Sequence, residues 1–138
     1  MQCKRAILVL VFFLVLSLVA CGDTSPPPGT KIEGLWGAEH LELLADRYGA
    51  LLEYDCASGT IDSPMILGAN GEFDLLGTHT LGGGPVNLDD PPEAQPARFQ
   101  GRVQGKRLEL TVTLTNTGVV IGPHILIRGE PGLLFRCL

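Results

Sequence analysis

Three histidines, His40, His79 and His124, are the residues of this sequence best suited to bind a metal or to transfer protons. They lie about forty residues apart, and no H-x-H or H-E-x-x-H motif places two of them on one element. We therefore interpret them as polar residues of strands or of a rim. The sequence predicts no metal site and no cofactor.

A second candidate is the stretch from Leu81 to Pro96, which is rich in glycine and acidic residues. Its triple glycine, which includes Gly83 and Gly84, lacks the strand-to-helix context and the Gly-Lys-Ser/Thr of a phosphate-binding loop. Its acidic pair, Asp89 and Asp90, lacks the alternating oxygen ligands of a calcium loop. Because long connections in compact domains are more often functional than idle, we predict a binding loop centred on these four residues.

Nucleophilic catalysis has little support in the sequence. Beyond the N-terminal apolar stretch the only serines are Ser25, Ser58 and Ser63, and none lies in a G-x-S-x-G turn. We therefore expect a protein that is not an enzyme.

The N-terminus has the pattern of a secretory signal. Lys4 and Arg5 precede an apolar segment, Ala6 to Ala20, and polar residues follow. At 15 residues this segment is shorter than the ~20 needed to cross a bilayer as a helix, which argues against a membrane-spanning anchor. We expect residues 1–20 to be a helical signal peptide.

The end of this signal, Leu18-Val19-Ala20-Cys21, resembles the lipobox of bacterial lipoproteins. The resemblance implies that Cys21 carries the lipid after cleavage, so that the protein is anchored in the cell membrane or the outer membrane with its domain facing the periplasm or the exterior. Gly22, rather than Asp, resembles outer-membrane sorting. Residues 21–34 contain Pro26-Pro27-Pro28 and are predicted to form a flexible tether, extended by about 3.1 Å per residue.

Two cysteines remain for the domain of residues 35–138. Cys56 and Cys137 form an even pair in an exported chain, which favours one disulfide over two free thiols or a shared metal. Without Lys4 and Arg5, eight basic side chains remain against 15 acidic ones. Such a surface repels phosphates, so we expect no nucleic-acid partner.

The elements that must position these residues are strands. Apolar and polar residues alternate over residues 107–115, and residues 97–104 alternate likewise across a Gly105-Lys106 turn, which predicts a hairpin. Residues 119–128 follow as a strand, with a bulge or edge predicted at Gly122-Pro123. A last strand is predicted over residues 133–137, with Leu133 and Phe135 on its core face.

Further strands are predicted in the first half of the domain. Residues 51–56 alternate, and residues 63–67 are expected to pair with residues 72–75 across Asn70-Gly71. Residues 38–48 also fit a helical stripe, but the glycines that bracket them, Gly37 and Gly49, favour a strand that ends in a turn.

Together these patterns predict an all-β fold: a small antiparallel meander barrel of about 7–8 short strands, with a two-sheet sandwich as the alternative. The interior is filled by its own side chains or admits one small apolar ligand. Trp36-Gly37-Ala38-Glu39-His40, Asp55 to Ile61 and Cys137-Leu138 look like a set of small uncharacterised bacterial lipoproteins. The hairpin over residues 99–105 loosely resembles lipocalins.

Two functions follow as hypotheses. The first is a membrane-tethered envelope module, binding or structural, that engages a small apolar ligand or an envelope protein at one barrel mouth and the Leu81 to Pro96 connection. The second is an inhibitor of an envelope hydrolase of the lysozyme or protease type, since an acidic surface suits a basic enzyme.

Overall fold

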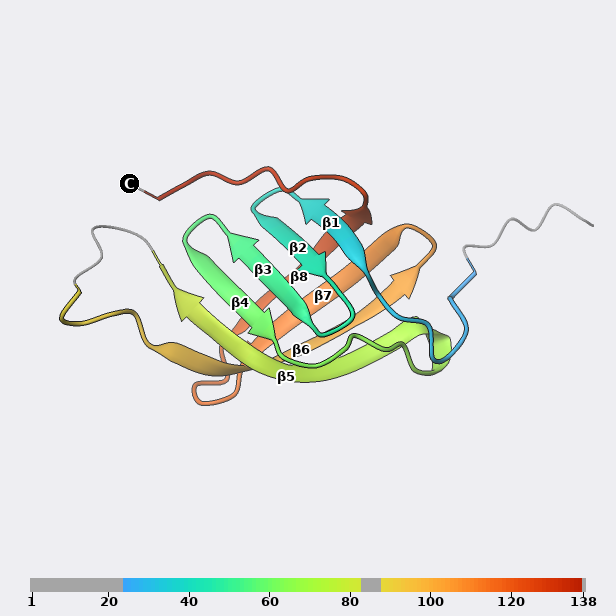
Figure 1. The fold of residues 1–138 in the computed structure, drawn as a ribbon, viewed down its shortest axis with the longest axis horizontal. Coiled ribbons are helices and arrows are strands. Elements are labelled where there is room, and N and C mark those ends of the chain that lie inside the picture. Colours follow the sequence, from blue (N-terminus) through green and yellow to red (C-terminus); the bar gives the residue numbers. More distant parts are fainter. Residues whose placement is uncertain (1–23, 83–87, 138) are drawn as a thin grey trace, which may run out of the picture.

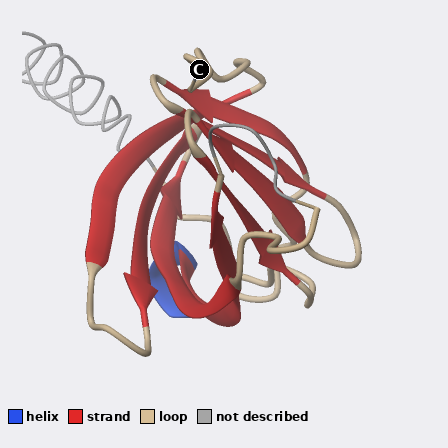
Figure 2. Cartoon of the chain, turned by 90° about the vertical axis from the view of Figure 1, so that its left-hand side faces the viewer, coloured by secondary structure: helices blue, strands red, loops and turns tan. Residues whose placement is uncertain are grey.

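The computed structural model describes residues 24–82 and 88–137, which form a closed antiparallel β-barrel (Figures 1 and 2). Each strand pairs with the next along the chain, and β8 closes on β1. The elements are β1 (Gly34–Ala38), β2 (Leu41–Ala45), β3 (Ala50–Tyr54), β4 (Ala57–Ile61), the short 3₁₀ helix η2 (Ala69–Gly71), β5 (Glu72–Leu81), β6 (Ala94–Gln104), β7 (Arg107–Leu114) and β8 (Val120–Arg128). The predicted meander barrel of about 7–8 short strands is confirmed, with eight strands. In the described residues no helix has the length and apolarity of a membrane span.

The two ends of the barrel are named here by what they carry. The η2 end has helix η2 and the β2–β3 and β6–β7 turns, and the N-terminal segment approaches it. The disulfide end has the β3–β4 turn and the C-terminus, and lies to the left in Figure 1.

Side-chain alternation builds the β6–β7 hairpin as predicted. On β7, Leu108, Leu110 and Val112 have no exposed surface, while the residues between them face outward. The β6–β7 turn places Gly105 at a positive φ of 57°. The β7–β8 register shifts between Leu110 and Val112, which confirms the predicted bulge near Gly122-Pro123.

Residues 38–48 are extended rather than helical, as expected, but they span two strands: Ala38 ends β1, the chain turns at His40, and β2 follows. β2 ends at Ala45, and the carboxylate of Asp46 accepts the backbone N–H groups of Tyr48 (2.7 Å) and Gly49 (3.0 Å). A Cβ atom at Gly49 would lie 1.9 Å from the carbonyl oxygen of Ile61, the last residue of β4. Only glycine therefore allows the β2–β3 turn to approach β4 this closely.

The prediction that residues 63–67 pair with residues 72–75 is wrong. The 63–67 segment instead meets the N-terminal segment: Ile32 N–H donates to the Met65 carbonyl (2.8 Å), and Leu67 N–H donates to that of Thr30 (2.8 Å). Ile32, Met65 and Leu67 are each at most 3% exposed. This pairing buries three apolar side chains at the η2 end, which a local hairpin does not do.

The described part of the expected tether also lies against the barrel. Gly29 N–H donates to the Leu67 carbonyl (2.7 Å), and Ser25 and Pro26 lie next to Gly71. The folded body therefore begins before residue 35, which differs from the expected flexible stretch up to residue 34. Cys21 lies outside the described residues.

The predicted strand over residues 133–137 is wrong as well. Residues 129–137, here called the C-terminal strap, run along the outside of β1 and make only one bridge, between Glu39 and Leu133. Leu133 and Phe135 are 59% and 52% exposed. A side chain at Gly37 would lie 2.3 Å from the backbone of Pro131, so this glycine provides the room in which the strap crosses β1.

The barrel closes at a short seam between β1 and β8. Only Trp36 with Arg128 and Gly37 with Ile127 are paired there, and Gly129 N–H donates to the Leu35 carbonyl beside them (2.7 Å). The other neighbouring strands pair over four or more positions.

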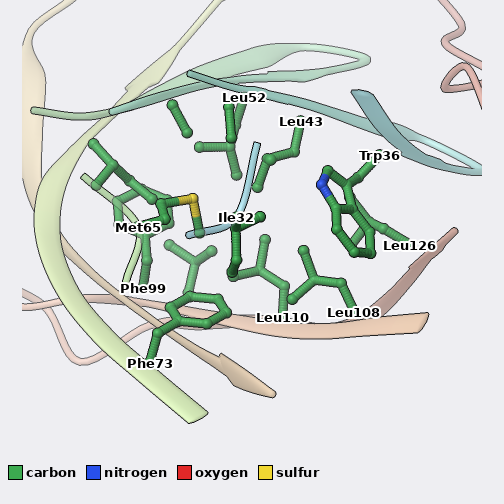
Figure 3. Packing of buried hydrophobic residues seen from close by; sticks show 14 of the residues in the cluster. Ile32, Trp36, Leu43, Leu52, Met65, Phe73, Phe99, Leu108, Leu110 and Leu126 are labelled. Atoms are coloured by element: carbon green, nitrogen blue, oxygen red, sulfur yellow. The ribbon is translucent and has the colours of Figure 1, made fainter. Parts of the chain in front are cut away.

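Apolar side chains fill the interior of the described barrel. Figure 3 shows Ile32 in the middle of a ring that includes Trp36, Phe73 and Phe99. Trp36 and Phe99 are at most 2% exposed. Of the two interiors considered from the sequence, the filled one is observed.

Candidate functional site

Polar aromatic side chains gather inside the disulfide end of the barrel. The ring of Tyr54, the last residue of β3, lies 5.2 Å from that of His79 on β5 and 6.3 Å from that of His124 on β8, both edge-on. His79 is only 2% exposed. Each of the three continues the inward phase of its strand, where Leu52, Phe73 and Leu126 are also buried.

This cluster has hydrogen-bonding capacity that no described protein group uses. Among the described residues five buried side-chain atoms lack a protein partner. Four belong to this cluster: the Tyr54 hydroxyl, His79 Nδ1, His124 Nε2 and Oε1 of Gln95, which lies opposite His79 in the β5–β6 register. The fifth is Trp36 Nε1, in the apolar core. Buried polar atoms in proteins nearly always have a partner, since an unpaired one costs about 1–3 kcal/mol. The cluster can therefore hold a ligand group or water molecules that donate and accept hydrogen bonds.

The cluster is uncharged near neutral pH. Burial lowers the pKa of His79, and burial together with the nearby His40 lowers that of His124. Burial also raises the pKa of the Tyr54 phenol above its usual range. Two neutral imidazoles, a phenol and an amide suit a neutral hydrogen-bonding group better than an anion or a cation.

A hydrogen-bonded pair of side chains lies at the rim beside the cluster. His40 Nδ1 lies 2.6 Å from the Asp55 carboxylate, which also accepts the backbone N–H of Phe135 in the strap (2.7 Å). The Phe135 N–H and the His40 side chain hold the pKa of Asp55 below its ordinary value. Asp55 thus holds the strap at the rim, beside the cluster.

The predicted disulfide between Cys56 and Cys137 is confirmed, with 5.4 Å between the two Cα atoms. It joins the end of the strap to the β3–β4 turn and borders an open groove of about 500 Å³. Tyr54 lines this groove as well, while its hydroxyl is buried with the cluster.

The predicted binding loop is described only in part. Gly83 and Gly84 lie outside the described residues. Asp89 and Asp90 are exposed in a turn that starts at Leu88, itself 91% exposed. Pro92, further along the same connection, lines the groove beside the disulfide. The connection therefore reaches the same end of the barrel as the polar cluster.

Sequence spacing missed that the three histidines share one end. His79 and His124 both contact Tyr54, and His40 is close enough to affect His124. The signal that could have found them was their position in the alternation of inward and outward residues, because His79 and His124 stand on the apolar face of their strands. In the described ranges no group of three or more His, Cys, Asp or Glu side chains is arranged to hold a metal.

A larger groove, of about 710 Å³, lies on the outer face of β5, β6 and β7. Two of its acidic side chains are paired across the strands: Glu72 with Arg102, which also lines the groove, and Asp74 with Arg98. Arg98 and Gln100 hold the pKa of Asp74 below its ordinary value. Since these charges are satisfied internally, this groove is the weaker candidate for a site.

Comparisons with protein-family models, curated proteins and solved structures find no match to this chain. The coarse assignment, a small eight-strand barrel with one disulfide, stands on the topology and residues described above.

Proposed function

We propose that the protein is a lipid-anchored module of the cell envelope that binds a partner through the disulfide end of its barrel. The anchor is supported by Leu18-Val19-Ala20-Cys21 and by the charged and apolar residues before it. A disulfide also suits an exported chain. The membrane is the cell membrane or the outer membrane, and the domain faces away from the cytoplasm.

The observation that carries the binding role is the set of four unpartnered polar atoms around Tyr54. The rest of the described interior is apolar apart from the indole nitrogen of Trp36, so a fold needing only a stable core gains nothing from buried imidazoles there. A partner that supplies a neutral donor and acceptor, such as an amide, offsets their cost when it binds. Because Tyr54 belongs to the cluster and also lines the groove beside the disulfide, we place the partner's contact at this end of the barrel.

The anchor is tested in cells fed labelled palmitate. Label is expected in the wild-type chain and not in Cys21→Ser, which should also leave the membrane fraction. Cys3→Ser is the matched control and should be labelled like the wild type. An unlabelled wild-type chain would refute the anchor.

The binding role is tested by NMR of the full chain with ¹⁵N-labelled histidine. The neutral amide N-acetylalanine amide is expected to shift the His79 and His124 signals saturably, while acetate does not. His79→Leu should abolish the response at His124, and Leu76→Ala, on an exposed residue of β5, should preserve it. If neither probe moves the signals, water satisfies the four atoms and the proposed site is wrong.

A further inference from the structure

The outer face of the β2–β3 hairpin carries an exposed apolar patch near the η2 end. Leu44 and Leu51 face each other across the two strands and are 52% and 58% exposed, and Tyr48 in the turn is 65% exposed. These three residues, here called the hairpin patch, border an open groove of about 530 Å³. The guanidinium carbon of Arg47 lies 4.6 Å from the centre of the Tyr48 ring.

The composition of the hairpin patch fits a lipid interface. Leucine side chains can enter the acyl boundary, while tyrosine and arginine keep their polar ends at the headgroups. The Asp46 carboxylate in the same turn accepts two backbone N–H groups, so part of its hydrogen-bonding capacity is met within the protein.

The path of the chain brings this end close to the proposed anchor. Ser25 and Pro26 already lie against Gly71, at the η2 end. Ser25 follows Cys21 by four Cα-to-Cα steps along the chain, and an extended chain spans at most ~3.6 Å per step. The η2 end therefore lies within about 14 Å of a lipid-bearing Cys21.

We propose that the barrel rests directly on the lipid surface through the hairpin patch, with the disulfide end turned away from the membrane. This inference rests on the proposed anchor at Cys21. In place of a domain held away from the membrane by a flexible tether, the proposal gives a barrel with a fixed orientation on the lipid surface. The excess of acidic side chains favours a zwitterionic over an anionic lipid surface.

The test uses the full lipidated chain in phosphatidylcholine vesicles whose headgroups carry a nitroxide quencher. An environment-sensitive dye is attached at Tyr48→Cys or, as the matched control, at Asn116→Cys in the exposed β7–β8 turn at the disulfide end. We expect the dye at the first site to shift to the blue and lose most of its emission, and the dye at the second to keep both. Adding Leu44→Glu and Leu51→Glu should restore emission at the first site.

Vesicle flotation separates the possible failures. Equal emission at the two sites in protein that floats would overturn the orientation and leave the anchor standing. Protein that does not float would overturn the anchor, and the orientation with it. Energy transfer between donor- and acceptor-labelled Tyr48→Cys chains without quenching would identify a second copy as the occupant and overturn the lipid contact.

Discussion

At the η2 end of the barrel, Ile32, Met65 and Phe73 form a buried apolar plug, whereas at the disulfide end Tyr54, His79 and His124 carry buried polar atoms for which the described part of the chain supplies no partner. The first end is closed by burial of apolar surface. The second is braced from outside by the strap and the Cys56–Cys137 bond. The η2 end therefore contributes packing energy to the stability of the fold. The disulfide end tolerates buried polar groups that cost stability, because the covalent crosslink offsets that cost.

The largest test of this contrast removes the brace. Replacing both Cys56 and Cys137 with Ser should lower the free energy of unfolding by about 4 kcal/mol, since the bond closes a loop of 81 residues in sequence separation. Urea unfolding of the full chain in detergent measures the loss. Reduction of the wild-type protein should give the same value, and a change below about 1 kcal/mol would show that the strap needs no crosslink.

The next test removes part of the plug. Ile32→Ala should cost about 3 kcal/mol, because it leaves a cavity where the 3% exposed side chain fills the middle of the core. Leu76→Ala, at a 70% exposed position, is the control and should change stability by less than about 0.5 kcal/mol. Equal losses in the two variants would mean that the N-terminal segment is not part of the core in solution.

At the disulfide end we expect a mutation that raises the free energy of unfolding, by less than the two losses above. His79→Leu should raise the free energy of unfolding by about 1 kcal/mol in ligand-free protein, since it removes an unpaired buried nitrogen. The same urea titration measures it. Destabilisation would show that His79 has a partner in solution and would weaken the contrast between the ends.

The smallest effect is a dependence on pH. The pKa values of His79 and His124 are lowered from 6.5 in the folded state, so below pH 6.5 the unfolded chain takes up protons that the folded one does not. Stability should therefore fall as the pH drops from 6.5 toward the folded pKa values. Unfolding midpoints between pH 7 and pH 5 should decline less in the variant His79→Leu with His124→Leu. An equal decline would assign the effect to other groups.

Some strands of the barrel could be predicted from the sequence and others could not. The hairpin of β6 and β7 was predictable because Leu108, Leu110 and Val112 alternate strictly with polar residues. β1 and β4 were not predicted, since Gly34, Gly37 and Gly59 interrupt their apolar pattern. The strap was mistaken for a strand because its alternation resembles one, although tertiary hydrogen bonds and not a sheet ladder hold it.

The candidate site was harder to predict than the fold. The disulfide followed from counting cysteines, but the polar cluster draws single residues from four strands, β3, β5, β6 and β8, and only closure of the barrel brings them together. A polar residue on the apolar phase of a strand was the local signal. Its neighbours depend on register and strand tilt, which residue types alone do not specify.

The short seam between β1 and β8 gives the molecule an intrinsic optical sensor. With only two paired positions, this junction is where thermal fluctuations separate neighbouring strands at the lowest cost. Trp36, the single tryptophan of the chain, forms one of those two pairs and is 2% exposed. When β1 separates from β8, the indole moves from hydrocarbon into water. The wavelength of its fluorescence therefore reports this opening of the barrel without any added label.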